Sequence, residues 1–510
     1  MIVDIRRRLR FPNISLQGWL LFGALLAGGF YRLYGLSAVP LGFDEASSLL
    51  IARSPAAEIL ELNKWGNSSP PLMLLILHGL LRFGDAEWMV RLMSVVAGLA
   101  LIPAVYALAG EFGGKSSAGL AALLVALAPC EVELSREYRV YALGGLFAAL
   151  AMLAALRYWR RPGTGRASLL ALLLFAGVQV QYALMPFYGA LIVALTAARY
   201  PPDWPVRRRL GHLALISGLC ALSMAAVYQV ALKYQFYGGR GASYAPAIAS
   251  PSVVHTLARV LLGTWKIVEY GFSSDVFVLL AGAGLAMALL QDWRNPLVLA
   301  TLSSFAIFAI LAVPNLYPYG PVRQCLVLLT PLYPLAAFAA VSLWGGRPRA
   351  REVCIWACAA VALAVPSVLA VVDTFGRPLA ASLQGRNNFR AAMDAIDHNF
   401  RDGDVMFVMP GAFPSYDYYS RRYRPRPWIK AEGTELWMRD ERSWQSLMGK
   451  EPPYTGQLRQ LLNRGGRVWL LNAHYLPGEM RFSELAARYG WWSRTRIVMN
   501  ADEIHLLLYE

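Results

Sequence analysis

Two adjacent carboxylates, Asp44 and Glu45, follow the first hydrophobic stretch of the chain, within residues 42–47. An acidic side chain inside a membrane-spanning helix costs about 2.5–3.5 kcal/mol, so a pair placed directly beside such a helix predicts a polar pocket at the membrane boundary. A carboxylate in such a pocket can take a proton from a hydroxyl group. The same pair also suits a solvated loop in which Asp44 caps the following helix. Position alone leaves both interpretations open.

Further polar residues gather in three later segments. Residues 131–139 contain three glutamates and two arginines, and residues 317–323 end in an arginine. Arginine's planar fork suits phosphate oxygens, and tyrosine and glutamine can bond hydroxyl groups. The candidate binding residues are Arg136, Arg139, Tyr141, His78, Gln181, Tyr319 and Arg323. Each also has an ordinary alternative, because such side chains reach headgroups, form aromatic belts or pack between helices in many membrane proteins.

The composition indicates a membrane protein with many spanning helices. Of the 510 residues, 57% are hydrophobic and only 16% are charged. The net charge of +16 does not indicate nucleic acid, because the arginines cluster in short loops between apolar runs and no nucleic-acid motif accompanies them. The five cysteines lie in or beside hydrophobic segments without a metal-binding spacing, so no metal site is predicted. A divalent metal on Asp44, Glu45 and Glu137 is possible but not indicated, since a full oxygen shell is missing.

The apolar runs predict eleven membrane spans and an uncleaved first helix, because no small-residue cleavage site follows it. The predicted spans are residues 17–36, 89–110, 117–134, 140–158, 167–182, 184–199, 211–232, 275–291, 297–313, 323–343 and 353–372. The run at residues 70–83 is shorter than the roughly 20 residues that a crossing needs, and it begins with two prolines. It therefore predicts a helix lying along the membrane interface in the first external loop.

Arginine-rich loops set the predicted orientation. With eleven spans and a cytoplasmic N-terminus, the loops rich in Lys and Arg all fall on the cytoplasmic side. The acid pair, residues 131–139, residues 317–323 and the polar tail then fall on the outer side. This predicts a site on the outer face of the membrane, built from segments far apart in the sequence.

The tail reads as a separate domain, so we predict a transmembrane domain at residues 1–372 and an extracytoplasmic α/β domain at residues 373–510. Helical patterns at 389–400, 457–463 and 483–489 alternate with strand patterns at 405–409, 467–471, 494–499 and 503–509. This alternation predicts a small α/β domain with a partly parallel sheet. No phosphate-binding glycine motif accompanies it, so we expect the tail to help position an acceptor rather than to supply the catalytic base.

An ordered set of motifs carries a family resemblance, strongest over residues 40–145. The motifs are the acid pair, residues 67–75 with the double proline, Asp85 and Glu87 before Arg91, residues 135–143, and residues 319–323. In this order and spacing they resemble the GT-C superfamily of polytopic glycosyltransferases. The branch they resemble contains the bacterial relatives of protein O-mannosyltransferases and the lipid A aminoarabinose transferase.

The resemblance implies a catalytic base at Asp44, with Glu45 beside it, and a second functional acid at Glu137. It also implies a polyprenyl-phosphate-linked sugar as the donor, an inverting transfer, and an undecaprenyl carrier in the bacterial cytoplasmic membrane. The chemistry is consistent, because an acceptor hydroxyl loses a proton as it attacks the anomeric carbon. The departing lipid phosphate needs positive charge, which Arg136, Arg139 and Arg323 would supply.

Two other classes stay open. A lipid transporter or flippase has a similar number of helices, but it should place ionisable residues or broken helices at the bilayer midplane, often in repeated halves. An O-antigen ligase or polymerase also uses lipid-linked sugars, but its chemistry is expected in a late external loop. The sequence does not predict which sugar is moved, or whether the acceptor is a lipid, a glycan or a protein.

Overall fold

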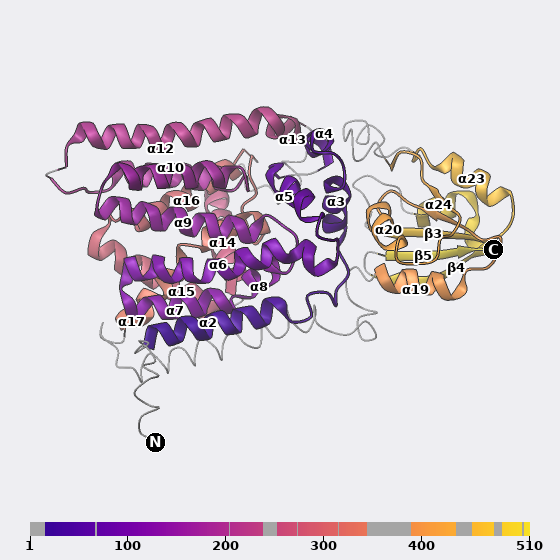
Figure 1. The fold of residues 1–510 in the computed structure, drawn as a ribbon, viewed down its shortest axis with the longest axis horizontal. Coiled ribbons are helices and arrows are strands. Elements are labelled where there is room, and N and C mark those ends of the chain that lie inside the picture. The colour runs from indigo at the N-terminus through magenta and orange to yellow at the C-terminus, as the bar shows by residue number, and fades with distance from the viewer. Residues whose placement is uncertain are drawn as a thin grey trace, which may run out of the picture. The chain divides into compact units, whose positions relative to one another are not determined.

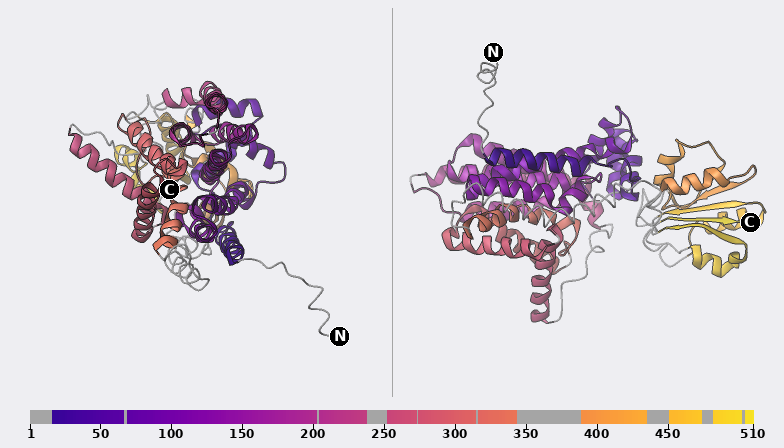
Figure 2. Two further views of the ribbon diagram at one scale, coloured as in Figure 1. Left: turned by 90° about the vertical axis from the view of Figure 1, so that its left-hand side faces the viewer. Right: turned by 90° about the horizontal axis from the view of Figure 1, so that it is seen from below.

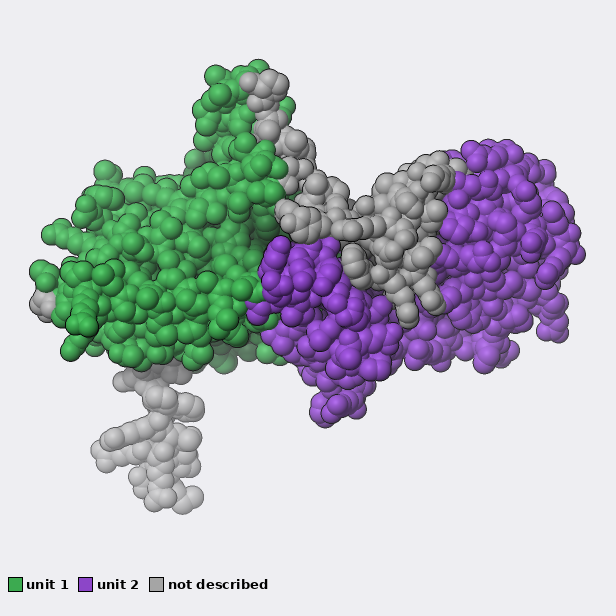
Figure 3. Space-filling model, turned by 90° about the horizontal axis from the view of Figure 1, so that it is seen from above, with its two compact units in different colours: residues 1–34, 93–225, 242–371 green, residues 35–92, 226–241, 372–510 purple. Residues whose placement is uncertain are grey.

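The computed structural model describes residues 16–66, 69–202, 204–237, 252–272, 274–314, 316–343, 389–434, 451–473, 482–501 and 504–510. The chain divides into two compact units (Figure 3). Unit 1 comprises residues 1–34, 93–225 and 242–371, and unit 2 comprises residues 35–92, 226–241 and 372–510. Unit 2 thus combines the first predicted external loop with the polar tail. The sequence-based boundary between residues 372 and 373 stays a prediction.

Apolar helices make up unit 1 (Figure 1), although residues 87–92 and 226–227 of two of these helices belong to unit 2. They are α2 (Leu16–Leu33), α6 (Glu87–Gly113), α7 (Lys115–Leu127), α8 (Pro129–Ser135), α9 (Tyr141–Arg160), α10 (Thr164–Val178), α11 (Leu184–Ala197), α12 (Val206–Val227), α14 (Val253–Phe272), α15 (Asp275–Asp292), α16 (Pro296–Ala312), the 3-10 helix η3 (Arg323–Leu329) and α17 (Leu332–Leu343). Helix α2 packs beside α7, α9 beside α10, α11 beside α16, and α15 beside α17. In contrast, α14 runs across the direction of these helices (Figure 2).

Ten of the eleven predicted spans correspond to a helix or a bent helix pair, and the eleventh, 353–372, lies outside the described residues. By length and apolar composition, four described helices can each cross a membrane, or up to six spans if two bent pairs are each counted as one. Three further apolar helices have 10–17 residues. The polytopic helical fold is thereby confirmed, and the number of spans stays a prediction.

A bend of 57° separates α7 from α8, and a buried arginine satisfies the backbone there. Arg32 of α2 is fully buried and donates to the carbonyl oxygens of Val125 (3.4 Å) and Ala126 (2.9 Å) in the last turn of α7. Its Nε donates to Ser135 Oγ at 3.2 Å. Carbonyls at a helix end inside hydrocarbon need such donors. Gly98 permits this approach, because a Cβ there would lie 2.0 Å from Ser135 Oγ.

Unit 2 contains short helices from the first loop, two helical segments from the end of α12 onward, and the tail. The loop and central elements are α3 (Phe43–Ala52), α4 (Ala56–Gly66), α5 (Leu72–Leu80), the π-helix η1 (Tyr228–Leu232) and α13 (Lys233–Tyr237). Helix α5, at nine residues, occupies the run predicted as an interfacial helix, and it is too short to cross a bilayer. Its placement along the membrane interface stays a prediction.

The tail folds as an α/β sandwich (Figures 1 and 2). Its elements are α19 (Phe389–Asn399), β1 (Val405–Val408), α20 (Phe413–Ser420), β2 (Trp428–Lys430), α23 (Thr455–Asn463), β3 (Val468–Ala473), α24 (Phe482–Tyr489), the 3-10 helix η4 (Trp491–Arg494), β4 (Thr495–Ala501) and β5 (Ile504–Tyr509). The strand order is β2-β1-β3-β5-β4, with β2, β1 and β3 parallel and β5 antiparallel to both neighbours. Helix α19 covers one face of the sheet, and α23 and α24 cover the other.

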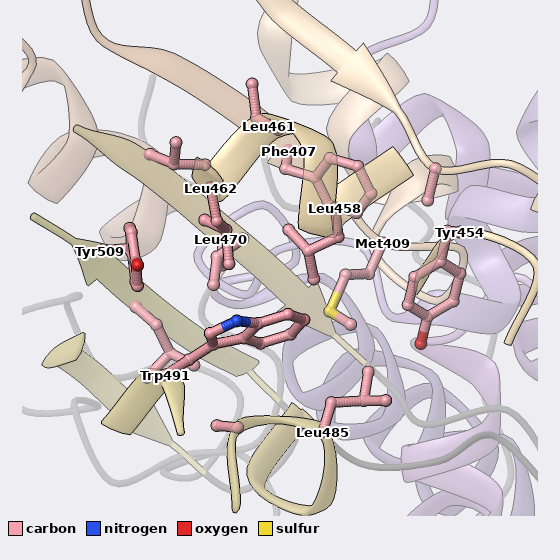
Figure 4. Close-up of a cluster of buried hydrophobic side chains, with 14 residues drawn as sticks. Phe407, Met409, Tyr454, Leu458, Leu461, Leu462, Leu470, Leu485, Trp491 and Tyr509 are labelled. Atoms are coloured by element: carbon pink, nitrogen blue, oxygen red, sulfur yellow. The ribbon is translucent and has the colours of Figure 1, made fainter. Parts of the chain in front are cut away.

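The core between the sheet and α23/α24 is apolar (Figure 4). Phe407 of β1 and Leu470 of β3 contribute from the sheet, and Leu458 and Leu485 contribute from the helices. The small α/β domain with a partly parallel sheet is therefore confirmed. The sequence reading missed α20 and β2.

Candidate functional site

The acid pair lies at the start of α3, where the two carboxylates have different surroundings. Gly42 is the N-cap residue, and its carbonyl accepts the first helical bond from Ala46 N at 2.9 Å. Glu45, in the third helical position, turns back and accepts a hydrogen bond from Gly42 N at 3.0 Å. Glu45 thus supplies the glutamate half of a capping box, and Gly42 has no side chain for the other half. Glu45 is buried, whereas Asp44 stays exposed. The negative charge of Asp44 is favoured at this position by the partial positive charge of the helix N-terminus.

Arg91 fixes Glu45. Its Nε and Nη2 donate to the two carboxylate oxygens at 2.9 and 2.7 Å. The remaining N–H groups donate to the carbonyl oxygens of Leu36 (2.7 Å), Val39 (3.0 Å) and Pro40 (3.0 Å). All five guanidinium donors are thus used, and the pair is almost completely buried. This arrangement favours a positioning role for Glu45 and leaves Asp44 as the candidate base.

His78 also supports α3. Its Nδ1 lies 2.9 Å from the carbonyl oxygen of Ala52, the last residue of α3. Because a carbonyl only accepts, Nδ1 carries the proton in this contact. The geometry gives His78 a helix-capping contact, and its predicted role in substrate binding stays a prediction.

A second cluster lies in unit 1, around the loop between α8 and α9. Arg323, the first residue of η3, donates from Nη1 to Glu137 Oε2 at 3.0 Å. Its side chain is 38% exposed and that of Glu137 is 19% exposed. Arg323 also interacts electrostatically with Tyr141, Tyr270 and Glu133. The structure thus brings together three of the predicted residues, Glu137, Tyr141 and Arg323, in a half-exposed polar group.

The two arginines of the 131–139 segment differ from Arg323. Arg136 is buried, and its Nη1 donates to the carbonyl oxygens of Tyr31 (2.7 Å) and Tyr34 (2.6 Å) at the end of α2. The backbone of Arg139 is joined to the Ser94 hydroxyl, which donates to the Arg139 carbonyl at 3.2 Å. The Arg136 contacts favour a structural role, and its phosphate-binding role stays a prediction.

The last two predicted binding residues, Tyr319 and Gln181, are buried in unit 1. The Tyr319 hydroxyl lies 2.6 Å from the Thr264 hydroxyl of α14. Burial raises the pKa of Tyr319 to about 12 despite this hydrogen bond, which lowers it, so the hydroxyl is neutral at pH 7. Gln181 packs so closely on α9 that a Cβ at Gly144 would lie 1.4 Å from its Oε1. Among the described residues, Oε1 has no hydrogen-bond partner.

The metal question concerns groups of acidic, histidine and cysteine side chains. Within the described ranges, no group of three or more such residues could hold a metal ion.

The roles of Arg91 and of the tail in supporting α3 were not predicted. Glu45 stands three residues after Gly42, the position of the glutamate in a capping box, which could have indicated its bond to the start of the helix.

Comparisons with known proteins agree with this fold. A sequence model of the dolichyl-phosphate-mannose-protein mannosyltransferase family matches residues 68–228. The structure is similar to ArnT from Cupriavidus metallidurans in the apo state, at a TM-score of 0.62 and 14% identity over 96% of this chain and 98% of that one. ArnT bound to undecaprenyl phosphate matches at 0.61 and 14% identity, over 97% and 98% of the chains.

A more distant similarity extends to the oligosaccharyltransferase of Archaeoglobus fulgidus in the apo form. Its TM-score is 0.51 at 13% identity, over 91% of this chain and 70% of that one. No curated protein matches the sequence significantly. The family match and the fold confirm the GT-C resemblance. The chain therefore has the fold shared by ArnT and this oligosaccharyltransferase.

Proposed function

We propose that this protein transfers a sugar from a polyprenyl-phosphate donor to an acceptor hydroxyl, with inversion at the anomeric carbon. The observation that carries the proposal is the likeness to ArnT over nearly the whole of both chains, including the ArnT structure bound to undecaprenyl phosphate. The family match over residues 68–228 supports the same donor class, since that family's name specifies a sugar on a polyprenyl phosphate.

The proposed mechanism needs one base. The acceptor oxygen attacks the anomeric carbon while its proton passes to the carboxylate of Asp44. The bond between the anomeric carbon and the phosphate oxygen breaks, and the polyprenyl phosphate leaves as an anion that needs no proton. Asp44 suits this role because it is exposed, whereas the neighbouring Glu45 is buried in its pair with Arg91.

Arg323 is the proposed phosphate ligand in unit 1. Its side chain is part-exposed, and Glu137 is the partner of its only hydrogen bond among the described residues. Glu137 thereby orients the guanidinium, whose other N–H groups remain available to phosphate oxygens. We propose the outer face of the bacterial cytoplasmic membrane as the location, which rests on the distribution of the arginine-rich loops. The acceptor hydroxyl belongs to a lipid, a glycan or a protein.

The test is a transfer assay with full-length protein reconstituted in vesicles. A panel of radiolabelled sugars on undecaprenyl phosphate is supplied with envelope lipids, glycans and peptides from the source cells as acceptors. Transfer with release of undecaprenyl phosphate supports the proposal. Binding of undecaprenyl phosphate without transfer or hydrolysis of any donor, together with movement of lipid-linked sugars across the vesicle membrane, would establish a transporter instead.

A further inference from the structure

A buried tyrosine of the tail forms a hydrogen bond with Leu41, which lies just before α3, the helix that contains Asp44 and Glu45. Tyr419, in α20, is 1% exposed. Its hydroxyl accepts a hydrogen bond from Leu41 N at 2.8 Å and donates one to Glu87 Oε1 at 3.1 Å. Burial, followed by the nearby charge of Glu87, raises the pKa of Tyr419, so the hydroxyl keeps the proton that it donates. All three residues belong to unit 2.

Glu87 is a meeting point for side chains of the tail. It lies in the first turn of α6 and is 6% exposed. Besides Tyr419, Arg390 of α19 donates to Glu87 Oε1, and Arg422 donates to the same oxygen at 3.3 Å. Arg390 also donates to the carbonyl oxygen of Ser37 at 2.8 Å. A buried carboxylate is costly unless it is paired in this way.

The other end of α3 is held as well. Arg53, the C-cap residue of α3, donates from Nη1 to Asp417 of α20 at 2.9 Å and from Nη2 to Asp85 at 2.7 Å. The Tyr418 hydroxyl donates to the carbonyl oxygen of Asp85 at 2.8 Å. Contacts to α20 therefore bracket the ten residues of α3, at Leu41 before it and at Arg53 after it. We call the tail residues Arg390, Asp417, Tyr418, Tyr419 and Arg422 the clamp.

The bond at Leu41 is the one closest to Asp44. Leu41 is 1% exposed and directly precedes the N-cap residue Gly42. Gly42 accepts the first bond of the helix through its carbonyl and bonds Glu45 through its N–H. Two residues beyond Gly42 stands Asp44. A shift of the Leu41 amide therefore moves the start of the helix and the carboxylate on it, and misplacing a catalytic group by about 1 Å can cost on the order of 100-fold in rate.

We propose that the tail, through Tyr419, is a positioning element for the base of the glycosyl transfer. Tyr419 is then a positioning residue that acts through Leu41 and Glu87, without touching the substrate. The inference rests on the proposed function, because it assigns Asp44 the role of base. The C-terminal domain would then help to position the base, in addition to the role in acceptor positioning that the sequence predicts.

The test variant is Tyr419→Phe in the full-length protein. Phenylalanine keeps the ring that stacks on Phe389, with centroids 5.6 Å apart, and removes only the hydroxyl. The matched control is Tyr423→Phe, which removes a tail hydroxyl bonded to Asp394 Oδ1 at 2.7 Å within the tail. Removal of the tail is a poorer test, because it would remove acceptor contacts and the clamp together.

We expect Tyr419→Phe to lower kcat about tenfold with donor KM within about twofold of wild type, a loss of the size of one or two hydrogen bonds. Hydrogen exchange of the amides of residues 41–50 should accelerate about tenfold in this variant. Both quantities should stay at their wild-type values in Tyr423→Phe. Adding Glu87→Gln to Tyr419→Phe should cost less than the product of the two single effects, because Tyr419→Phe has already removed the hydrogen bond that Glu87→Gln weakens.

Two results would overturn the inference. One is that Tyr419→Phe has the same kcat, and the same rate of hydrogen exchange in residues 41–50, as Tyr423→Phe. The other is a uniform acceleration of exchange across the tail without a selective change in α3, which would make the hydroxyl a stabilising group only. A wild-type protein that transfers no polyprenyl-linked sugar would refute the proposed function instead, and the exchange measurement would still test the clamp.

Discussion

Two arginine–glutamate pairs, one in each unit, differ in what they leave available. The Arg91–Glu45 side chains are 4% and 6% exposed, and all five donors of Arg91 are used within the protein. The Arg323–Glu137 side chains are 38% and 19% exposed, and among the described residues Arg323 makes a single hydrogen bond. A fully used, buried pair fixes backbone, whereas a part-exposed pair can exchange water for a ligand. The same two residue types are thus suited to positioning in one place and to binding a ligand in the other.

The strongest test of this contrast is Asp44→Asn. It removes the proposed base and keeps the shape of the side chain, so kcat should fall by about 10²–10⁴-fold while binding of undecaprenyl phosphate persists. Glu45→Gln should be milder, because Glu45 only orients the start of α3. Turnover of a polyprenyl-phosphate sugar is the measurement.

The matched control for Asp44→Asn is Asp275→Asn, the same change at an exposed acid in the first turn of α15. It should leave turnover unchanged. Near wild-type turnover by Asp44→Asn would remove Asp44 from the mechanism, and a larger loss in Glu45→Gln would reverse the roles assigned to the pair.

The buried pair should dominate stability. Arg91→Met leaves Glu45 buried without its partner and three carbonyls without donors, so it should cost about 3–5 kcal/mol. Thermal unfolding in detergent measures this loss of stability. The control is Arg82→Met, the same change at an exposed arginine. The double variant with Glu45→Gln should regain part of the loss, since it removes the unpaired charge. Equal melting temperatures for Arg91→Met and Arg82→Met would contradict the positioning role of Arg91.

The part-exposed pair should act on the donor. Arg323→Ala should raise donor KM by about 10- to 100-fold, the worth of charge-assisted hydrogen bonds to phosphate. Arg139→Ala should do the same if Arg139 also holds the phosphate. Lysine at either position should recover only part of the lost donor affinity, because the bidentate geometry of arginine is lost.

The control for the donor experiment is Arg294→Ala, which removes an exposed arginine after α15. A rise in acceptor KM alone, with donor KM unchanged, would exclude Arg323 and Arg139 as phosphate ligands. Equal effects of alanine and lysine at position 323 would show that the fork geometry is not used.

The helices were predictable because continuous apolar runs and their length determine a membrane helix directly. The tail was predictable where strand and helix periodicity alternate, as at β1 and α19. Helix α20 was missed because its eight residues include three tyrosines and a proline without a clear apolar period. It is instead fixed by contacts with a loop more than 300 residues earlier in the chain, such as the bond between Tyr419 and Leu41.

The candidate site was predictable in residue types but not in roles. Acids and arginines at the ends of apolar runs indicate a polar site, yet burial separates Asp44 from Glu45 and Arg136 from Arg323. That separation depends on partners distant in sequence, such as Arg91, 46 residues after Glu45. A linear pattern contains the short spacing between Gly42 and Glu45, but not the pairing of residues so far apart.

The smallest expected effect distinguishes the two kinds of role at Tyr319. The sequence predicts a substrate ligand, whereas the structure places its hydroxyl 2.6 Å from Thr264 in a buried contact. If this bond only packs α14, Tyr319→Phe should lower stability by about 0.5–1.5 kcal/mol and leave donor KM unchanged. Thr264→Val should have a similar effect, and the double variant should be close to either single one, because both remove the same bond. A donor KM that rises in Tyr319→Phe but not in Thr264→Val would instead make the hydroxyl a ligand, and Tyr319 would join Arg323 on the binding side of the comparison.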